Sequence, residues 1–300
     1  MRVVVFAMPG RLAGPALLAL LEAGAEVAAV VVPAPPGAPP LAPAPPVAPP
    51  DSFIGVGQPP PLGPLQVAAA RGLPALAVGR RAEPALATAI AAYRPDLACV
   101  VCWPWRIPPA LLAVPRLGFL NLHPAPLPEL RGPEPLFWAF QEGRRQTAVT
   151  LHWMDEQFDT GDIAARAPVP LPAGIGWDAA EERVAVAGAA LLQELVPRLA
   201  SGEVPRRQQG PGGSYRGSPV EEDFAIEPGW PAERAFRFMR GTAAWGRPYR
   251  LRADGAAPVW LGAAIDCDPV GVLGAPLMIE GALARAQLSP GVLSATLARR

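Results

Sequence analysis

The sequence predicts an α/β fold in which a mostly parallel sheet is followed by a small β-rich domain. Residues 3–6 and 27–32 are continuous apolar runs, and residues 10–22 between them carry leucines at helical spacing. A strand, a helix and a second strand within about thirty residues form a βαβ unit, which requires a parallel sheet. The chain has 300 residues, of which 51% are hydrophobic and 17% charged. It is therefore long enough for two domains and can bury a sizeable core, which argues against global disorder.

The remainder of the first 200 residues continues this alternation. Residues 148–154 alternate apolar and polar side chains, which is typical of a half-buried strand. Residues 177–196 form an amphipathic pattern that predicts a long helix, and we expect Pro197 to end it because proline breaks a helix interior. The further predicted helices are residues 65–71, 83–94, 108–114 and 133–142, and the further predicted strands are residues 75–78, 97–102, 119–122 and a run from Ile163.

Two segments are predicted to lack regular structure. Residues 33–64 contain 14 prolines and one charge, Asp51, and proline both fixes φ and lacks the N–H donor. This segment predicts an exposed loop, and the Gly-, Pro- and Arg-rich residues 201–218 predict a linker. We therefore expect a first domain over residues 1–200 and a second over 219–300. In the second domain we expect a helix over 231–240 and strands over 249–251, 258–261, 276–279 and 282–286.

The charged residues exclude several chemistries. All 26 basic residues are arginine and balance 26 acidic ones, so the formal net charge is zero. Without lysine there can be no GxxxxGK[ST] phosphate loop, no Schiff-base lysine and no protein-kinase strand lysine. The spacing of the two histidines, His123 and His152, excludes an HExxH zinc site. The balanced charge gives no reason to expect a strong nucleic-acid binder.

The three cysteines favour a reducing compartment. Cys99, Cys102 and Cys267 are an odd number, and no secretory signal or uninterrupted apolar span is present, so we expect a cytoplasmic protein without a membrane partner. Cys99 and Cys102 form a CxxC that could be a redox or zinc pair. Because they lie in an apolar run, on opposite sides of a strand, inert core cysteines are favoured.

The densest polar signal is the segment Asn121-Leu-His-Pro124, where a buried strand ends. Ligands of open α/β sheets bind beyond the carboxyl ends of strands, so a site is expected there. Asn121 and His123 are two apart on an extended chain and share one side of it. The alternative is a strand-end cap with His123 bonded to a carbonyl. A second segment, 158–162, contains Asp159-Thr-Gly, which alone indicates an ordinary turn.

Two long motifs resemble the 10-formyltetrahydrofolate-dependent formyltransferases. Residues 115–135 are similar to that family's strand ending in Asn-x-His and the following Pro- and Arg-Gly-containing loop, and residues 154–163 resemble its Met-Asp-x-Gly-Leu-Asp-Thr-Gly-Asp block. The resemblance covers residues 1 to about 200. It extends more weakly over residues 226–249, which are similar to the start of the OB-like domain of methionyl-tRNA formyltransferases.

The resemblance implies a Rossmann-like catalytic domain, 10-formyltetrahydrofolate as donor, no metal, and Asn121, His123 and Asp159 as catalytic residues. Formyl transfer to an amine passes through a tetrahedral oxyanion, which the Asn121 amide could stabilise. The amine loses a proton and the folate nitrogen gains one, so a histidine such as His123 suits both steps. Asp159 would orient His123 and favour its charged form.

Five further residues are candidates for the same site. Trp103 and Trp105 follow a strand end where the family binds the folate pterin, and could stack on it or pack in the core. Asp155, in the second motif, is expected beside the cofactor. Arg131 could contact an anionic substrate or hold its loop by a salt bridge. His152 could line the pocket or be a satisfied strand histidine.

The amine acceptor is the point on which the sequence departs from the family. Ala125 stands where the family loop has serine, and the loop 33–64, usually basic in methionyl-tRNA formyltransferases, has no Lys or Arg. Residues 213–300 hold 10 Arg against 9 acidic residues. Arg234, Arg237 and Arg240 share one side of a helix and form either a phosphate-binding stripe or, as we favour, a solvated face.

By domain order the resemblance favours transfer to methionyl-tRNA, a role in protein biosynthesis with initiator tRNA as partner. The alternatives are transfer to a small amine such as a nucleotide-linked amino sugar, hydrolysis of the donor, or folate binding without catalysis.

Overall fold

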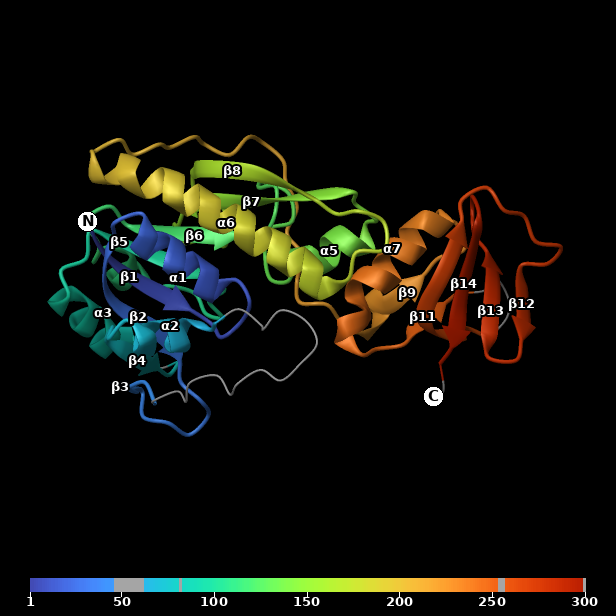
Figure 1. Ribbon diagram of the computed structural model, residues 1–300, viewed down its shortest axis with the longest axis horizontal. Coiled ribbons are helices and arrows are strands. Elements are labelled where there is room, and N and C mark those ends of the chain that lie inside the picture. The colour runs from blue at the N-terminus through green and yellow to red at the C-terminus, as the bar shows by residue number, and fades with distance from the viewer. Residues whose placement is uncertain (46–61, 81–82, 253–256, 299–300) are drawn as a thin grey trace. The chain divides into compact units, whose positions relative to one another are not determined.

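The computed structural model describes residues 1–45, 62–80, 83–252 and 257–298. The chain divides into two compact units (Figure 1). The first comprises Met1–Arg131, Ala148–Val169 and Glu181–Ser214, and the second comprises Gly132–Thr147, Pro170–Ala180 and Tyr215–Arg300. Two short segments from within residues 1–200 thus belong to the second unit. Residues 46–61 of the Pro-rich loop 33–64 lie outside the described residues.

An eight-stranded sheet forms the frame of the first unit, in the order β3-β4-β2-β1-β5-β6-β7-β8. The five strands from β4 to β6 pair in parallel, whereas β3 pairs antiparallel with β4 and β7 antiparallel with β6. Runs of valine build the central strands, as expected for strands buried on both faces. The strands are β1 Arg2–Ala7, β2 Glu26–Pro33, β3 Leu41–Pro43, β4 Ala75–Val78, β5 Leu97–Val101, β6 Phe119–His123, β7 Gln146–Trp153 and β8 Ile163–Pro170.

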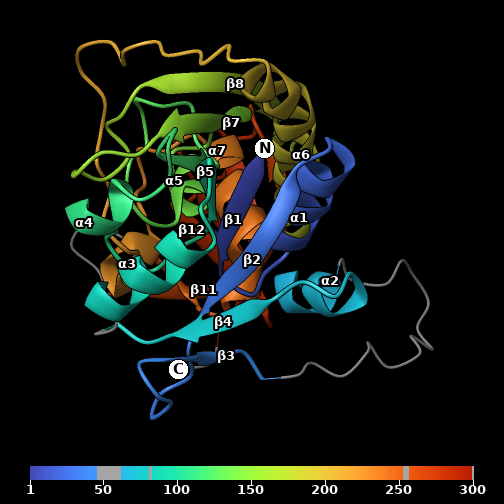
Figure 2. The ribbon, with the colours of Figure 1, turned by 90° about the vertical axis from the view of Figure 1, so that its left-hand side faces the viewer.

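Helices cover both faces of this sheet (Figure 2). One face packs against α1 Ala13–Glu22, α2 Pro64–Ala70 and α6 Trp177–Ala200, and the other against α3 Glu83–Ala92 and α4 Pro109–Leu112. Each face has its own apolar cluster, because successive residues of a strand point to opposite sides. The sheet is therefore a three-layer α/β structure, as the βαβ pattern predicts.

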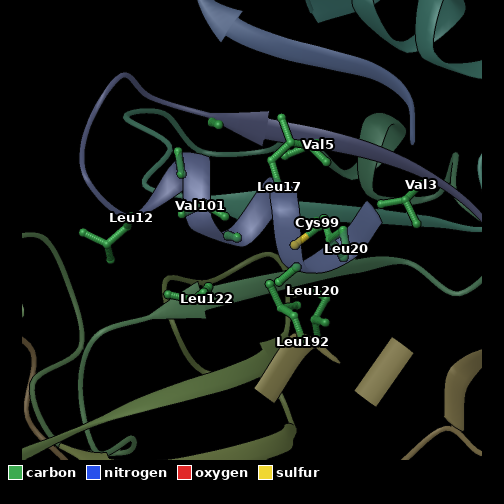
Figure 3. Packing of buried hydrophobic residues seen from close by; sticks show 14 of the residues in the cluster. Val3, Val5, Leu12, Leu17, Leu20, Cys99, Val101, Leu120, Leu122 and Leu192 are labelled. Carbon is green, nitrogen blue, oxygen red and sulfur yellow. The ribbon is translucent and has the colours of Figure 1, made fainter. Parts of the chain in front are cut away.

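The packing of α6 on β6 determines which side of β6 is polar. Leu120 and Leu122 point toward α6, where Leu192 lies beside Leu120 (Figure 3). The approach is close: a Cβ added to Gly188 of α6 would lie 2.6 Å from Leu122 Cδ1. Leu120 and Leu122 thus anchor one side of β6, and its intervening residues are directed to the opposite face of the sheet.

The second unit contains the C-terminal sheet, in the order β12-β13-β14-β11-β10-β9, and α7 Ala232–Thr242 lies against β11 and β14. Aromatic side chains fill its core, with Phe238 and Tyr249 rings 5.3 Å apart. Its remaining elements are α5 Pro135–Gln141, β9 Ala225–Ile226, β10 Tyr249–Leu251, β11 Val259–Asp268, β12 Leu277–Glu280, β13 Leu283–Gln287, β14 Val292–Leu297, and the 3₁₀ turns Glu221–Phe224 and Ala243–Trp245. The predicted fold class is confirmed: a large, mostly parallel sheet with a second, β-rich sheet.

Four local predictions are wrong. The helix α6 continues past Pro197 to Ala200, because its last turn packs in the core through Leu199 although Pro197 has no N–H to donate. A strand, β3, lies within the Pro-rich segment, at the sheet edge where proline is tolerated. The strand β7 is buried on both sides rather than half-buried. Cys102 is exposed, because β5 ends at Val101 and the chain turns at φ +55°.

The cysteine that does lie in the core is Cys99, whose thiol pKa is raised by burial to about 12. It is therefore a poor nucleophile. Within the described ranges, we find no helix with the length and apolarity that a membrane span requires.

Candidate active site

Strand register brings three polar side chains to one face of the sheet. Asn121 and His123 alternate with Leu120 and Leu122, so they face away from α6. In the antiparallel β6–β7 pair, Asn121 lies opposite His152. Opposite residues project to the same face, so His152 joins Asn121 and His123.

The loop after β7 adds a carboxylate to these three groups. Asp159 Oδ1 lies 3.4 Å from Asn121 Nδ2, 3.4 Å from His152 Nε2 and 3.7 Å from His123 Nδ1. The exposed fractions of the side chains are 6% for His123, 2% for His152 and 11% for Asp159. The three residues predicted to be catalytic therefore meet in one enclosed cluster, together with His152.

The partners of His152 define its tautomer. Its Nδ1 lies 3.1 Å from the Trp153 carbonyl oxygen, which can only accept, so Nδ1 carries a proton. Its Nε2 lies 3.0 Å from Asn121 Nδ2, which can only donate. In the tautomer with its proton on Nδ1, His152 accepts from Asn121 and holds the nitrogen of that amide toward the cluster.

In His123 it is Nε2, and not Nδ1, that faces a backbone carbonyl. Its Nε2 donates to the Leu130 carbonyl at 3.0 Å, so in the neutral ring Nδ1 is the unprotonated nitrogen. Burial lowers the pKa of His123 below its usual value of 6.5, and the nearby Asp159 carboxylate opposes this shift by favouring the charged ring, whereas His152 adds to it. At neutral pH, His123 is therefore a neutral base with Nδ1 turned toward Asp159.

Three residues of the loops around the cluster adopt the left-handed conformation without being glycine. They are Cys102 after β5, Leu130 after β6 and Asp159 after β7, with φ values of +55°, +56° and +56°. Each costs on the order of 1–3 kcal/mol, and such strain concentrates at functional sites. Two of the three act directly on the cluster, because the Leu130 carbonyl holds His123 and Asp159 supplies the carboxylate.

The loop carrying Asp159 is held by its own side chains. Asp155, which the resemblance places beside the cofactor, accepts from Thr160 Oγ1 at 2.7 Å and from the Gln157 N–H at 2.9 Å. A Cβ added to Gly161 would lie 1.9 Å from the Trp153 carbonyl oxygen, so only glycine fits there. In this arrangement the Asp155 carboxylate stabilises the loop, and its predicted cofactor contact stays a prediction.

The two tryptophans predicted to stack on the cofactor have different surroundings. Trp103 packs edge-on against the core residue Phe6, with ring centroids 5.2 Å apart. Trp105 packs edge-on against Trp103 at 5.3 Å. Arg106 next to it donates to the Glu156 carbonyl, which links the loop after β5 to the loop after β7.

Arg131 holds a loop in this structure, through an amide rather than a carboxylate. Its guanidinium donates to Gln209 Oε1 at 2.8 and 3.3 Å. Gln209 Nε2 in turn donates to the carbonyls of Asp159 and Gly161, both at 2.8 Å. Gln209 is not predictable from the sequence, because it lies in the irregular segment 201–218 and no motif or periodicity marks it.

Comparison with known proteins identifies the class to which this fold and cluster belong. The chain matches the family described as Formyl transferase over residues 1–196. The methionyl-tRNA formyltransferase of Bacillus licheniformis is 33% identical over 203 residues, 67% of this chain and 64% of that protein. The methionyl-tRNA formyltransferase of Citrifermentans bemidjiense is 33% identical over 258 residues, 85% of this chain and 75% of that protein.

Two solved structures share the fold. The N-formyltransferase from Helicobacter canadensis, solved with folinic acid and dTDP-3-aminofucose, gives a TM-score of 0.65 at 12% identity over 99% of both chains. HypX from Aquifex aeolicus, in complex with tetrahydrofolic acid, gives 0.57 at 17% identity, over 98% of this chain and 43% of that one.

This chain belongs to the formyl transferase family. It spans 64% and 63% of the lengths of the Bacillus licheniformis and Geobacillus relatives that it matches.

Proposed function

We propose that the protein transfers the formyl group of 10-formyltetrahydrofolate to a primary amine, with methionyl-tRNA as the acceptor. The observation that carries the proposal is the contact of one carboxylate oxygen, Asp159 Oδ1, with Asn121, His123 and His152 in a chain of this family. The names of its 29–37% identical relatives support the acceptor. The folate compounds in the Helicobacter and Aquifex structures support the donor.

In the proposed reaction the amine nitrogen attacks the formyl carbon, and the carbonyl electron pair moves to oxygen. Asn121 has two N–H groups, of which one donates to His152 at 3.0 Å and the other makes the longer, 3.4 Å bond to Asp159. The second N–H makes the weaker of the two bonds, and in the proposed transition state it leaves Asp159 and donates to the oxyanion. A donor directed at a developing oxyanion is worth about 3–4 kcal/mol of barrier.

His123 moves the protons in this proposal. Its unprotonated Nδ1 takes the proton that the attacking amine loses, and Asp159 stabilises the imidazolium that results. The proton is then given to folate N10, the bond between N10 and the formyl carbon breaks, and the products are the formylated amine and tetrahydrofolate. The lowered pKa of His123 keeps the ring ready to accept a proton at neutral pH.

The remaining predicted site residues complete the proposal. Trp105, with Trp103 behind it, forms the pterin-stacking surface, and Asp155 orders the loop that faces the donor. Arg131 and His152 stand on the acceptor side, where Arg131 also holds its loop.

A small amine on a nucleotide-linked sugar is the second candidate acceptor, favoured by two observations. The Helicobacter N-formyltransferase, solved with an amino sugar nucleotide, matches 99% of both chains. The second observation concerns α7, where Arg237 is buried and bonded to Glu233 and the Leu171 carbonyl. The expectation that Arg237 lies on a solvated face is therefore wrong, and Arg237 cannot join the alternative phosphate-binding stripe either. Arg234 stacks on Trp230, 3.7 Å from its ring centroid.

The test measures consumption of 10-formyltetrahydrofolate by the purified full chain, with charged initiator methionyl-tRNA, with a nucleotide-linked amino sugar, and with no acceptor. Formyl-methionyl-tRNA formed at a rate above that of the Asn121→Ala variant supports the proposal. Consumption with the amino sugar alone moves the function to the second candidate, and formate released without an acceptor makes the protein a hydrolase. Folate binding with no consumption under any condition overturns the catalytic proposal. The cytoplasmic location stays a prediction from the cysteines.

A further inference from the structure

The side-chain amide of Gln209 uses every hydrogen-bonding position that it has. Its two N–H groups donate to the carbonyls of Asp159 and Gly161, each at 2.8 Å. Its oxygen accepts twice from the Arg131 guanidinium, at 2.8 Å from Nη2 and 3.3 Å from Nε. A half-buried glutamine on an irregular segment rarely finds four partners, and most side-chain amides bond partly to water.

These partners are the two loops that hold the reacting groups. The carbonyls of Asp159 and Gly161 flank Thr160, so the amide bridges the turn in which Asp159 is left-handed at φ +56°. Arg131 follows Leu130, whose carbonyl accepts from His123 Nε2. Gln209 therefore connects Arg131, which follows the acceptor of His123, with the backbone of Asp159, whose carboxylate faces His123.

A second residue of the same segment strengthens this connection. Ser214 Oγ accepts from the Leu130 N–H at 3.0 Å, and the Ser214 carbonyl accepts from the Arg131 N–H at 2.8 Å. The loop 130–131 is thus held from both Gln209 and Ser214, whereas among the described hydrogen bonds the carbonyl of Asp159 is held by Gln209.

We propose that Gln209 is a positioning residue that sets the separation of Asp159 Oδ1 from His123 Nδ1. The inference rests on the proposed formyl transfer for its effect on turnover, and on geometry alone for its effect on His123. Without the two donated bonds, the strained turn relaxes and the carboxylate withdraws. The imidazolium form of His123 then loses its counter-charge.

The chain offers a matched pair of substitutions. Gln209→Met keeps the length of the side chain and removes all four hydrogen bonds. Gln208→Met makes the same change at the exposed neighbouring residue and is the control. Gln209→Glu keeps the acceptor for Arg131 but cannot donate to the carbonyls of Asp159 and Gly161. It therefore tests these two donated bonds separately, and it replaces the Met variant if that variant does not fold.

The first readout is the titration of the histidine rings by NMR in the unliganded protein, which has only two histidines to assign. The titratable groups that face His123 are Asp159 and His152, with the Leu130 carbonyl as its acceptor. Withdrawal of Asp159 removes the attraction that favours the charged ring. The pKa of His123 is expected to fall further, with the titration midpoint at least about 0.5 lower in pH in Gln209→Met than in Gln208→Met. In Gln209→Glu the new carboxylate itself favours the charged ring, so the decisive readout for that variant is kcat.

The second readout is steady-state kinetics. A misplacement of one reacting group by about 1 Å costs on the order of 10- to 100-fold in rate. We expect kcat to fall by that factor in both Gln209 variants, with KM for the folate donor within about twofold of the control. An unchanged His123 titration in a folded Gln209→Met variant overturns the positioning role, and so does an unchanged kcat in a folded Gln209→Glu variant. If the unmodified protein shows no turnover, the proposed function fails, and the titration still decides the role of Gln209.

Discussion

Asn121 and His152 lie directly opposite each other across the β6–β7 pair, and Asn121 Nδ2 is 3.0 Å from His152 Nε2. In the tautomer in which His152 Nδ1 donates to the Trp153 carbonyl, His152 Nε2 accepts from Asn121. The amide of Asn121 is therefore fixed with its nitrogen toward the cluster, which is the orientation that an oxyanion requires. His152 on β7 thus orients the side-chain amide of Asn121 on β6.

Replacement of Asn121 by alanine is expected to lower kcat by about 100- to 1,000-fold, because the donor to the oxyanion is lost. KM for the folate donor is expected to stay within about threefold, since the interaction forms in the transition state. Single-turnover measurement of donor consumption separates the chemical step from product release. A thermal melt like that of the unmodified protein is the control for folding, and an unchanged kcat would contradict the assignment.

The pairing also predicts a non-additive effect of His152. His152→Ala leaves the Asn121 amide without its acceptor, and we expect kcat to fall by about tenfold. In the double variant Asn121→Ala/His152→Ala, the second substitution is expected to cost less than it does alone, because the two side chains act as one unit. Additive losses within about 0.3–0.5 kcal/mol would show that His152 acts independently of Asn121.

The parts of the site that depend on strand periodicity could be predicted from the sequence. Asn121 and His123 share a face because they are two residues apart on a strand. The parallel sheet follows from the valine runs of β1 and β2 around α1. These features depend on residues close in the chain, where local patterns carry the information.

The parts that depend on long-range contacts could not be derived in this way. Asp159 Oδ1 reaches His123 only through a left-handed turn, and the turn signature alone indicates nothing about a site. Gln209 is 78 residues from Arg131 and lies on an irregular segment without periodicity. The extension of α6 past Pro197 likewise depends on packing of its last turn, including Leu199, which is 2% exposed.

The two tryptophans after β5 are expected to respond differently to alanine. Trp103 packs on Phe6 in the core, so Trp103→Ala is expected to lower the free energy of unfolding by about 2 kcal/mol. Within the described residues, the aromatic ring that Trp105 packs against is that of Trp103. Trp105→Ala is therefore expected to raise KM for the folate donor by about three- to tenfold, with a small effect on stability. Denaturant unfolding and donor titration check the two effects. Equal loss of stability in both variants would assign Trp105 to packing.

Burial of His123 predicts a pH dependence of stability. The pKa of His123 is lowered in the folded protein, so the unfolded chain binds its proton first as the pH falls below about 6.5. The stability contributed by the neutral, buried ring is present above pH 6.5 and is lost as the pH falls toward the lower, folded-state pKa. Urea unfolding between pH 7.5 and 5 is expected to show a steeper loss for the unmodified protein than for His123→Gln. Identical slopes would place the pKa of His123 near its usual value.

The turn that presents Asp159 is expected to tolerate no side chain at Gly161. A Cβ there would lie 1.9 Å from the Trp153 carbonyl oxygen, a backbone atom that cannot move without distorting β7. Gly161→Ala is therefore expected to cost about 1–3 kcal/mol of stability and to reduce kcat by at least about tenfold, because the turn must open and Asp159 then leaves the cluster. Gly210→Ala is the matched control, since a Cβ at Gly210 meets nothing within 4 Å. Both substitutions add one methyl group close to Gln209, which bonds the Gly161 carbonyl and precedes Gly210. The difference between the two variants in melting temperature and kcat therefore reports the geometry of the turn. A Gly161→Ala variant with the activity of the control would show that Asp159 reaches His123 without the tight turn.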